Sequence, residues 1–293
     1  MTEQVIFDRG YRTYDGPRTG PTGARRAVYK DGLKRILGLG RKARYKIFPW
    51  SLISIALIAA AVFVGIHWAI GDIAESIGEG VPSYGGLFDF YSAISLLFIA
   101  FAGPQLLIPD RTRGVLSVYF SRPLTVDGYL VSKVGAFATL VGGFYIIPQL
   151  VLHIGLALLA DEGFLPYLGN TLDVLWKVPV ITLGFVALHG ALVFSLAAVI
   201  ERTGIGAAAF LGLLTAGGAI AARVAEASFP GARWVSLAAL DQHPRIIRDT
   251  LFENTVDYPA EIAGFEVWAS VAVIAVLVVA AIIFVRARYR RLA

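Results

Sequence analysis

Six long apolar stretches constrain what this chain can fold into. Each contains about 20 or more mostly apolar residues, the length that an α-helix needs to cross a hydrocarbon layer about 30 Å thick. Of the 293 residues, 57% are hydrophobic and only 16% are charged, which is too much apolar surface for one soluble core. The sequence therefore predicts an all-α integral membrane protein with six transmembrane helices. They are expected at residues 47–70, 90–108, 131–160, 174–200, 204–224 and 267–285.

The distribution of charge predicts the orientation of these spans. With six spans, 21 of the 26 Lys and Arg residues fall on one side of the membrane, and 14 of the 21 acidic residues fall on the other. Basic loops are retained in the cytoplasm, so both termini are expected inside. Residues 1–46 contain no apolar run, and we expect no cleaved signal peptide. The net charge of +5 is thereby explained as a topology signal, and no nucleic-acid partner is expected.

Three regions follow from this topology. Residues 1–46 form a cytoplasmic segment, residues 47–285 a six-helix transmembrane domain, and residues 286–293 a basic cytoplasmic tail. The pattern over residues 24–46 predicts an amphipathic interfacial helix on the inner membrane surface, which either anchors the first span or docks a partner protein. Its apolar side would carry Val28, Leu33, Ile36 and Leu37, and its basic side Arg25, Arg26, Lys30, Lys34 and Arg35.

The inner loop at residues 109–133 is the most informative segment. Asp110 is expected to cap a short helix that ends before Pro123, and Thr125 is expected to cap the third span, with Asp127 in its first turn. A short amphipathic helix held between two spans is typical of a lever whose apolar face fills a groove on a cytoplasmic partner. The alternative is an interfacial helix that only rests on lipid headgroups. The lever residues would be Asp110, Arg111, Arg113, Val115, Leu116, Tyr119, Phe120 and Arg122.

This loop also resembles a known family. Its basic start, Gly114, apolar half-turn, Ser121-Arg122-Pro123 and downstream Lys133 resemble the coupling loop of ABC-2-type transporter permeases. The N-terminal stretch Tyr11-x-x-Tyr14-x-Gly16-Pro17-Arg18, with the basic helix after it, is similar to bacterial members of that superfamily. With six spans and both termini inside, the resemblance covers essentially the whole chain. Many members have Glu where this chain has Asp110, so a specific ion pair with a partner is not carried over.

The resemblance implies the permease subunit of an ATP-binding cassette exporter in the bacterial cytoplasmic (inner) membrane. Such a subunit moves a hydrophobic or amphipathic substrate while ATP and Mg are bound by a separate ATPase, so this chain is expected to be no enzyme and to hold no cofactor or metal. The sequence agrees in having no Gly-x-x-x-x-Gly-Lys-Ser/Thr phosphate loop. The coupling loop would touch the ATPase through the lever residues given above.

The resemblance further implies a second permease copy, either identical or different. Spans one, two and five would face that copy and line the path, for which Phe98, Phe101, Gln105 and Phe210 are candidates. Span five is rich in Gly and Ala from Gly204 to Gly218, which fits either a subunit interface or ordinary packing within the chain.

Other function classes have less support in the sequence. An ion-coupled secondary transporter usually needs carboxylates in the middle of a span, and the predicted spans contain none. His67, His153 and His189 fall inside spans, where a neutral His that hydrogen-bonds a neighbouring helix is the simpler interpretation. No catalytic constellation supports a membrane-embedded enzyme, and a non-transport assembly factor stays open. The segment 225–266 is too polar to span and is expected to form short helices at the outer surface.

Overall fold

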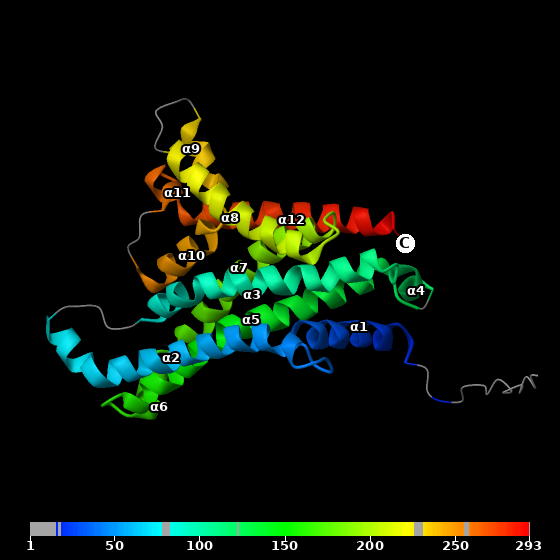
Figure 1. Cartoon of the computed structure of the whole chain (residues 1–293). Coiled ribbons are helices and arrows are strands. Elements are labelled where there is room, and N and C mark those ends of the chain that lie inside the picture. Colours follow the sequence, from blue (N-terminus) through cyan, green and yellow to red (C-terminus); the bar gives the residue numbers. More distant parts are fainter. Residues whose placement is uncertain are drawn as a thin grey trace, which may run out of the picture.

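The computed structural model describes residue 16 and residues 19–77, 83–121, 123–225, 231–254 and 258–292. All regular elements within these residues are helices (Figure 1). The N-terminal stretch from Tyr11 to Arg18, apart from Gly16, lies outside the described residues, and so does Arg122 of the coupling loop.

Among the residues that the structure describes, six helices are long and apolar enough to cross a membrane, which agrees with the predicted number of spans. The second span begins earlier and ends later than predicted. It includes Pro104 and Pro109 without a break and therefore contains Asp110. The six helices are α2 (Arg44–Ile77), α3 (Tyr84–Thr112), α5 (Val126–Leu159), α7 (Val174–Ala197), α8 (Thr203–Ala225) and α12 (Val267–Arg290).

The core of the bundle lies between α3, α5 and α7. These three helices are more than half buried, whereas α2, α8 and α12 keep most of their surface exposed. Aromatic rings fill the centre, where Phe185 stacks on Phe88 and on Tyr145. Helices α3 and α7 approach closely at Gly103, because a Cβ atom there would overlap the Val193 side chain. Close approach through small residues is the usual way in which membrane helices pack.

The N-terminal helix α1 (Gly20–Ile36) packs along α5 and α3 through Val28, Gly32 and Ile36. It is shorter than predicted, since the helix ends at Ile36 and does not continue to Lys46. Gly38 and Gly40 have φ values of 65° and 75°, a conformation that glycine tolerates and that ends a helix. A turn then leads into α2.

Short helices cover the two ends of the bundle. Helix α4 (Leu116–Phe120) joins α3 to α5, and α6 (Phe164–Asn170) follows α5. The described part of the segment before α12 forms no span and contains short helices, as predicted. That segment contains α9 (Ala232–Val235), η1 (Ser236–Ala238), α10 (Gln242–Phe252) and α11 (Pro259–Ile262).

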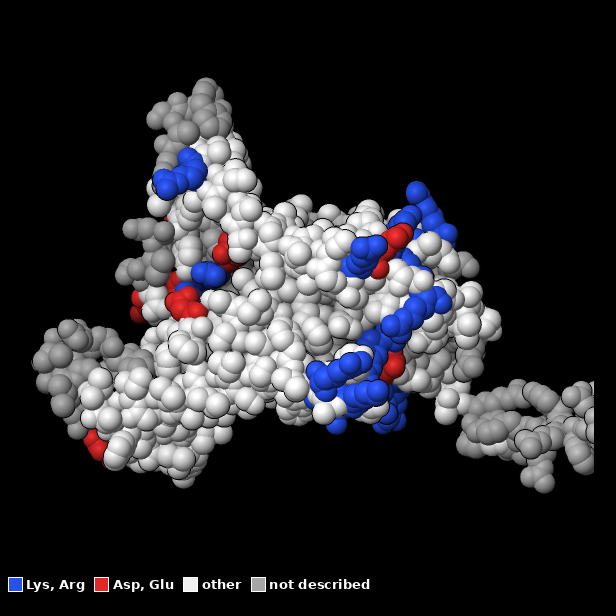
Figure 2. Space-filling model, viewed as in Figure 1, with Lys and Arg blue, Asp and Glu red and all other residues white. Residues whose placement is uncertain are grey.

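The two ends of the bundle differ in charge. Helix α4 and the C-terminal end of α12 lie at one end, while α6 and α9 to α11 lie at the other (Figure 1). Figure 2 shows most of the visible Lys and Arg side chains gathered near α1 and the C-terminal end of α12. A broad uncharged band separates them from a mixed group of charges at the far end (Figure 2).

Candidate functional site

A buried ionic cluster, formed by Arg35, Asp31, Asp110 and Lys133 with Tyr129, joins α1, α3 and α5 next to α4. The Asp110 carboxylate lies 2.6 Å from Nη1 of Arg35 and 2.7 Å from Nζ of Lys133. Tyr129 donates its hydroxyl hydrogen to Oδ2 of Asp110 over 2.9 Å. The Asp110 and Lys133 side chains are 2% and 0% exposed. Charges so fully removed from water require partners, and here each has one.

Asp31 completes the charge balance of the cluster. Its Oδ2 lies 2.9 Å from Nη2 of Arg35 and 3.8 Å from Nζ of Lys133. Two cations therefore face two carboxylates. Burial alone lowers the pKa of Arg35, but the Asp110 carboxylate raises it above its ordinary value, so the guanidinium stays charged. Arg35 was expected on the solvated basic side of its helix, and it points instead into the bundle.

The prediction that Asp110 caps the coupling helix is wrong. Asp110 lies inside α3, which ends only at Thr112, with Arg113 as its C-terminal cap. The coupling helix starts later, with Val115 as its N-cap, and has only five residues. Gly114, at a φ of 67°, separates the two helices. Pairing with Arg35 and Lys133 explains why this carboxylate is stable within the helix.

Arg111 was expected among the lever residues that contact a partner, but it binds this chain's own backbone. Its guanidinium donates to the carbonyl groups of Ala197, Val199 and Ile200 at the C-terminal end of α7. These carbonyl groups have no partner within the helix, and a cation there also interacts favourably with the helix dipole. Arg111 thus ties the end of α3 to the end of α7.

The predicted apolar face of the coupling helix packs on the bundle rather than facing outward. Leu116 is buried, and the half-buried rings of Tyr119 and Phe120 lie 5.9 and 6.0 Å from the Tyr129 ring. Tyr129 stacks in turn on Tyr289 of α12. Burial and the nearby Asp110 raise the pKa of the Tyr119 hydroxyl, which therefore stays protonated.

The surface of α4 and its flanking residues that faces away from the bundle is small and partly apolar. We call it the outer face of α4, and it consists of Arg113, Gly114, Ser117, Val118 and Ser121, all exposed. Val118 is the large apolar residue among them, with 53% of its surface exposed. Val115 is half-buried between the two sides.

The four candidate path residues have different surroundings. Phe98 is fully buried and stacks on Phe144 of α5, while Phe210 is fully buried on α8 against His189. Phe101 lies 5.0 Å from the Phe48 ring. The half-buried Gln105 offers its backbone carbonyl to Arg35 at 3.5 Å. Their role in lining a path stays a prediction.

A second ionic group lies at the opposite end of α3. Arg248 of α10 pairs with Asp249 at 2.7 Å and with Asp89 near the start of α3. Tyr258 donates its hydroxyl hydrogen to Asp249 over 2.7 Å. This group fastens the segment before α12 to the bundle. Nearby, the Tyr84 hydroxyl lies 2.7 Å from Nδ1 of His153, which confirms the predicted bond to a neighbouring helix for that histidine.

The sequence did not predict the cluster, although Arg35, Asp110 and Lys133 were each singled out for other reasons. Lys133 stands in an apolar helix after Thr125, and an ionisable residue in such a place is itself a signal for a buried partner. Local spacing could not reveal its partner Asp110, because Asp110 belongs to another helix. Arg35, which pairs with the same carboxylate, belongs to a third helix.

A scan against models of protein families and a search of curated proteins both found no match to this chain. The described residues include no group of His, Cys, Asp or Glu that could hold a metal ion. The geometry places a charge-balanced junction of three helices beside a short exposed connection between two spans.

Proposed function

We propose that this chain is the membrane subunit of an ATP-driven exporter, with α4 as the contact to a separate ATPase on the cytoplasmic side. The observation that carries the proposal is the attachment of α4. It is exposed on one side, and its other side is packed against Tyr129, next to the Asp110 cluster. A force on the outer face of α4 would reach α1, α3 and α5 through that cluster and α7 through Arg111.

The charge distribution supports the cytoplasmic assignment. Lys and Arg gather at the end of the bundle that carries α1 and the end of α12 (Figure 2). Under the positive-inside rule that end faces the cytoplasm, where ATP is available. The α4 connection lies at the same end (Figure 1).

The contact surface proposed here differs from the apolar face expected from sequence. Leu116 and Tyr119 contribute to packing within the chain, so the partner would touch Arg113, Ser117, Val118 and Ser121. Val118 would be the apolar anchor of this contact and Arg113 a charge at its rim. The exported molecule would be hydrophobic or amphipathic, as the apolar spans suggest.

The test is ATP hydrolysis by the reconstituted complex. The chain is co-expressed with its ATPase, recognised by the phosphate-loop motif that this chain lacks, and the complex is placed in vesicles. Val118→Asp introduces a charge at the centre of the proposed contact and should weaken ATPase binding about thirtyfold, as loss of a hot-spot residue does. Val118→Thr keeps the size and should bind normally.

Leu165→Asp supplies the matched control for charge. Leu165 is 76% exposed on α6. Helix α6 follows the C-terminal end of α5, whereas α4 precedes its N-terminal end. This variant should leave ATPase binding unchanged. Normal ATPase binding and hydrolysis by Val118→Asp would contradict the proposed contact, and failure to find any ATPase in the working assembly would contradict the function.

The proposal also includes a second permease copy. Helices α2 and α8 both pack on α3 and keep large apolar residues exposed, among them Ile58 and Ile220. Because the chain has no cysteine, single cysteines report contacts cleanly. Leu213→Cys and Ile220→Cys, two exposed positions one heptad apart on α8, should give disulfide-linked dimers on oxidation, and Val279→Cys on α12 should not. Dimers through α12 alone would contradict this arrangement.

A further inference from the structure

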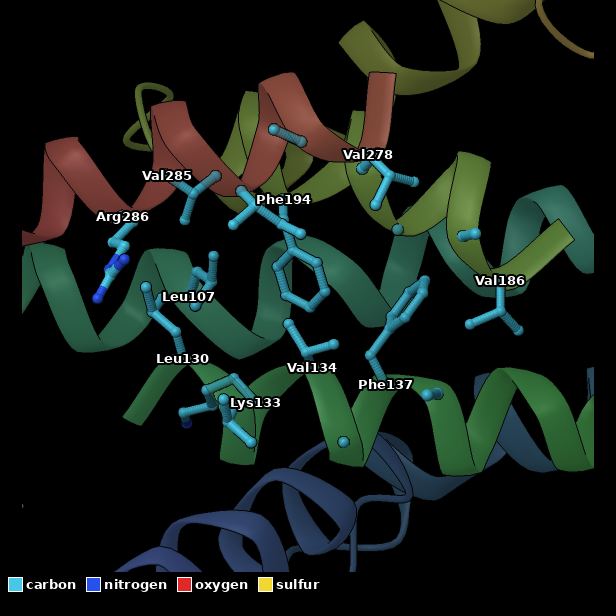
Figure 3. Close-up of a pocket in the computed structure, with 18 of the residues that line it drawn as sticks. Leu107, Leu130, Lys133, Val134, Phe137, Val186, Phe194, Val278, Val285 and Arg286 are labelled. Carbon is cyan, nitrogen blue, oxygen red and sulfur yellow. The ribbon is translucent and has the colours of Figure 1, made fainter. Parts of the chain in front are cut away.

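An apolar groove between α5, α7 and α12 is separate from the ATPase contact proposed above. It has a volume of about 660 Å³, within the range of about 300–1,000 Å³ that small-molecule sites occupy. Figure 3 shows Phe137, Phe194, Val134 and Leu130 along its walls. The exposed side chains of Val131, Leu183 and Ile282 also line it, so the groove opens sideways from the bundle.

The groove runs along the helices for about the depth of one leaflet. Its lining extends from Val278 to Arg286 on α12, which is about 12 Å at 1.5 Å per residue. On α7 it extends from Leu183 to Phe194, or about 16 Å. Half of a hydrocarbon core about 30 Å thick measures about 15 Å. The groove therefore matches one acyl chain in length and in chemistry.

One end of the groove is positively charged. Arg286 lies at that end, with Val186 and Val278 at the other (Figure 3). Its guanidinium pairs with both oxygens of Asp127 at 2.7 and 2.6 Å, and Arg290 approaches the same carboxylate at 3.6 Å. Two cations thus share one carboxylate, which leaves a net positive charge. All three side chains are about half exposed and accessible to a ligand.

We propose that this groove binds one anionic phospholipid, with an acyl chain between α5, α7 and α12 and its phosphate beside Arg286 and Arg290. An apolar wall that opens toward the membrane selects a lipid chain, and the net charge at the groove end selects an anionic headgroup over a zwitterionic one. In the proposed orientation the lipid belongs to the inner leaflet. Only this leaflet assignment depends on the proposed function.

The test measures lipid retained by the purified chain without any ATPase. The protein is incubated in detergent with phosphatidylglycerol or phosphatidylcholine, washed, and weighed by native mass spectrometry. Wild type should retain one phosphatidylglycerol and little phosphatidylcholine. Arg290→Gln should reduce the preference for phosphatidylglycerol over phosphatidylcholine about fivefold, as expected for loss of one cation near a membrane surface. Arg291→Gln, an exposed basic change outside the groove, should leave the preference unchanged.

A second experiment fills the groove with bulky side chains and measures the same lipid retention. Val134→Trp and Ala187→Trp place bulk on two different walls and should each abolish retention. Val276→Trp is the matched control, because Val276 is 66% exposed on α12 but does not line the groove. Equal retention of both lipids by wild type, or retention unchanged in both filled variants, would overturn the proposal. So would a helix of another membrane protein found seated in the groove.

Discussion

The ammonium nitrogen of Lys133 lies 2.7 Å from Oδ2 of Asp110, at a place where neither side chain has more than 2% of its surface exposed. The pair joins α3 and α5 directly beneath the short helix that connects them. A buried ion pair contributes little net stability by itself, but removing one partner leaves the other charge buried and unpaired. The cluster is therefore a site where single and double substitutions give different results.

Asp110→Asn should destabilise the protein strongly, because it leaves Lys133 and Arg35 with only Asp31 as a charged partner. The expected cost is about 3–5 kcal/mol. The double variant Asp110→Asn with Lys133→Met should cost less than the sum of the two single changes, since it leaves Arg35 paired with Asp31. Unfolding in mixed micelles with increasing denaturing detergent measures the stability of the two single variants and of the double variant. Strict additivity would contradict the pairing.

Arg111→Gln should loosen the junction between α3 and α7. Loss of the cation removes contacts to the carbonyl groups of Ala197, Val199 and Ile200, with an expected cost of about 1 kcal/mol. Arg111→Lys keeps the charge and should recover part of the loss. Hydrogen exchange in the last turn of α7 should rise in Arg111→Gln and stay near normal in Arg111→Lys. Unchanged exchange in both variants would show that the cap is unimportant.

Two glycines provide a matched pair for helix packing. Gly103→Ala should destabilise the protein by about 1–3 kcal/mol, because the added methyl group overlaps Val193 across α3 and α7. Gly212→Ala on α8 meets no described atom within 4 Å and should be neutral or stabilise by up to about 1 kcal/mol. Thermal unfolding in one detergent compares them. A loss in Gly212→Ala as large as in Gly103→Ala would contradict the packing.

Acidification should weaken the end of the protein that contains α10. His243 donates its Nε2 hydrogen to the Leu237 carbonyl, Nδ1 lies 3.0 Å from the Ser270 hydroxyl, and burial lowers the pKa of this histidine. The unfolded chain then takes up a proton more readily, so stability falls as the pH drops below the ordinary value of about 6.5. Burial raises the pKa of Asp249, but its bonds to Arg248 and Tyr258 lower it overall. Its contribution is present above the ordinary carboxylate pKa and is lost in more acidic solution.

Thermal unfolding at several pH values checks this expectation. Each group can contribute a slope of up to about 1.4 kcal/mol per pH unit. His243→Gln should remove the part of the slope that begins near pH 6.5, and Asp249→Asn should remove only the part at lower pH. A slope that is the same in His243→Gln and in wild type would show that this histidine is not the titrating group.

The sequence predicted the features that depend on local chemistry. Six apolar runs marked the spans, and Thr125 accepts a hydrogen bond from the Gly128 amide as expected of an N-cap. It failed where a distant partner decides the outcome. Asp110 reads as a helix start from its neighbours alone, yet it pairs with Arg35, which lies 75 positions earlier. The apolar face of the inner loop was expected to meet a partner, but it packs on the bundle.

The pairing of Arg35 with Asp110 also implies an order of assembly. During synthesis Arg35 emerges together with Asp31 but long before Asp110 and Lys133, which complete the cluster, and a charged group enters an apolar site only with its partners. Helix α1 can dock only after α3 and α5 have been inserted. Helix α1, the first helix among the described residues, thus reaches its final place only after α5, and its attachment marks the completion of the first three spans.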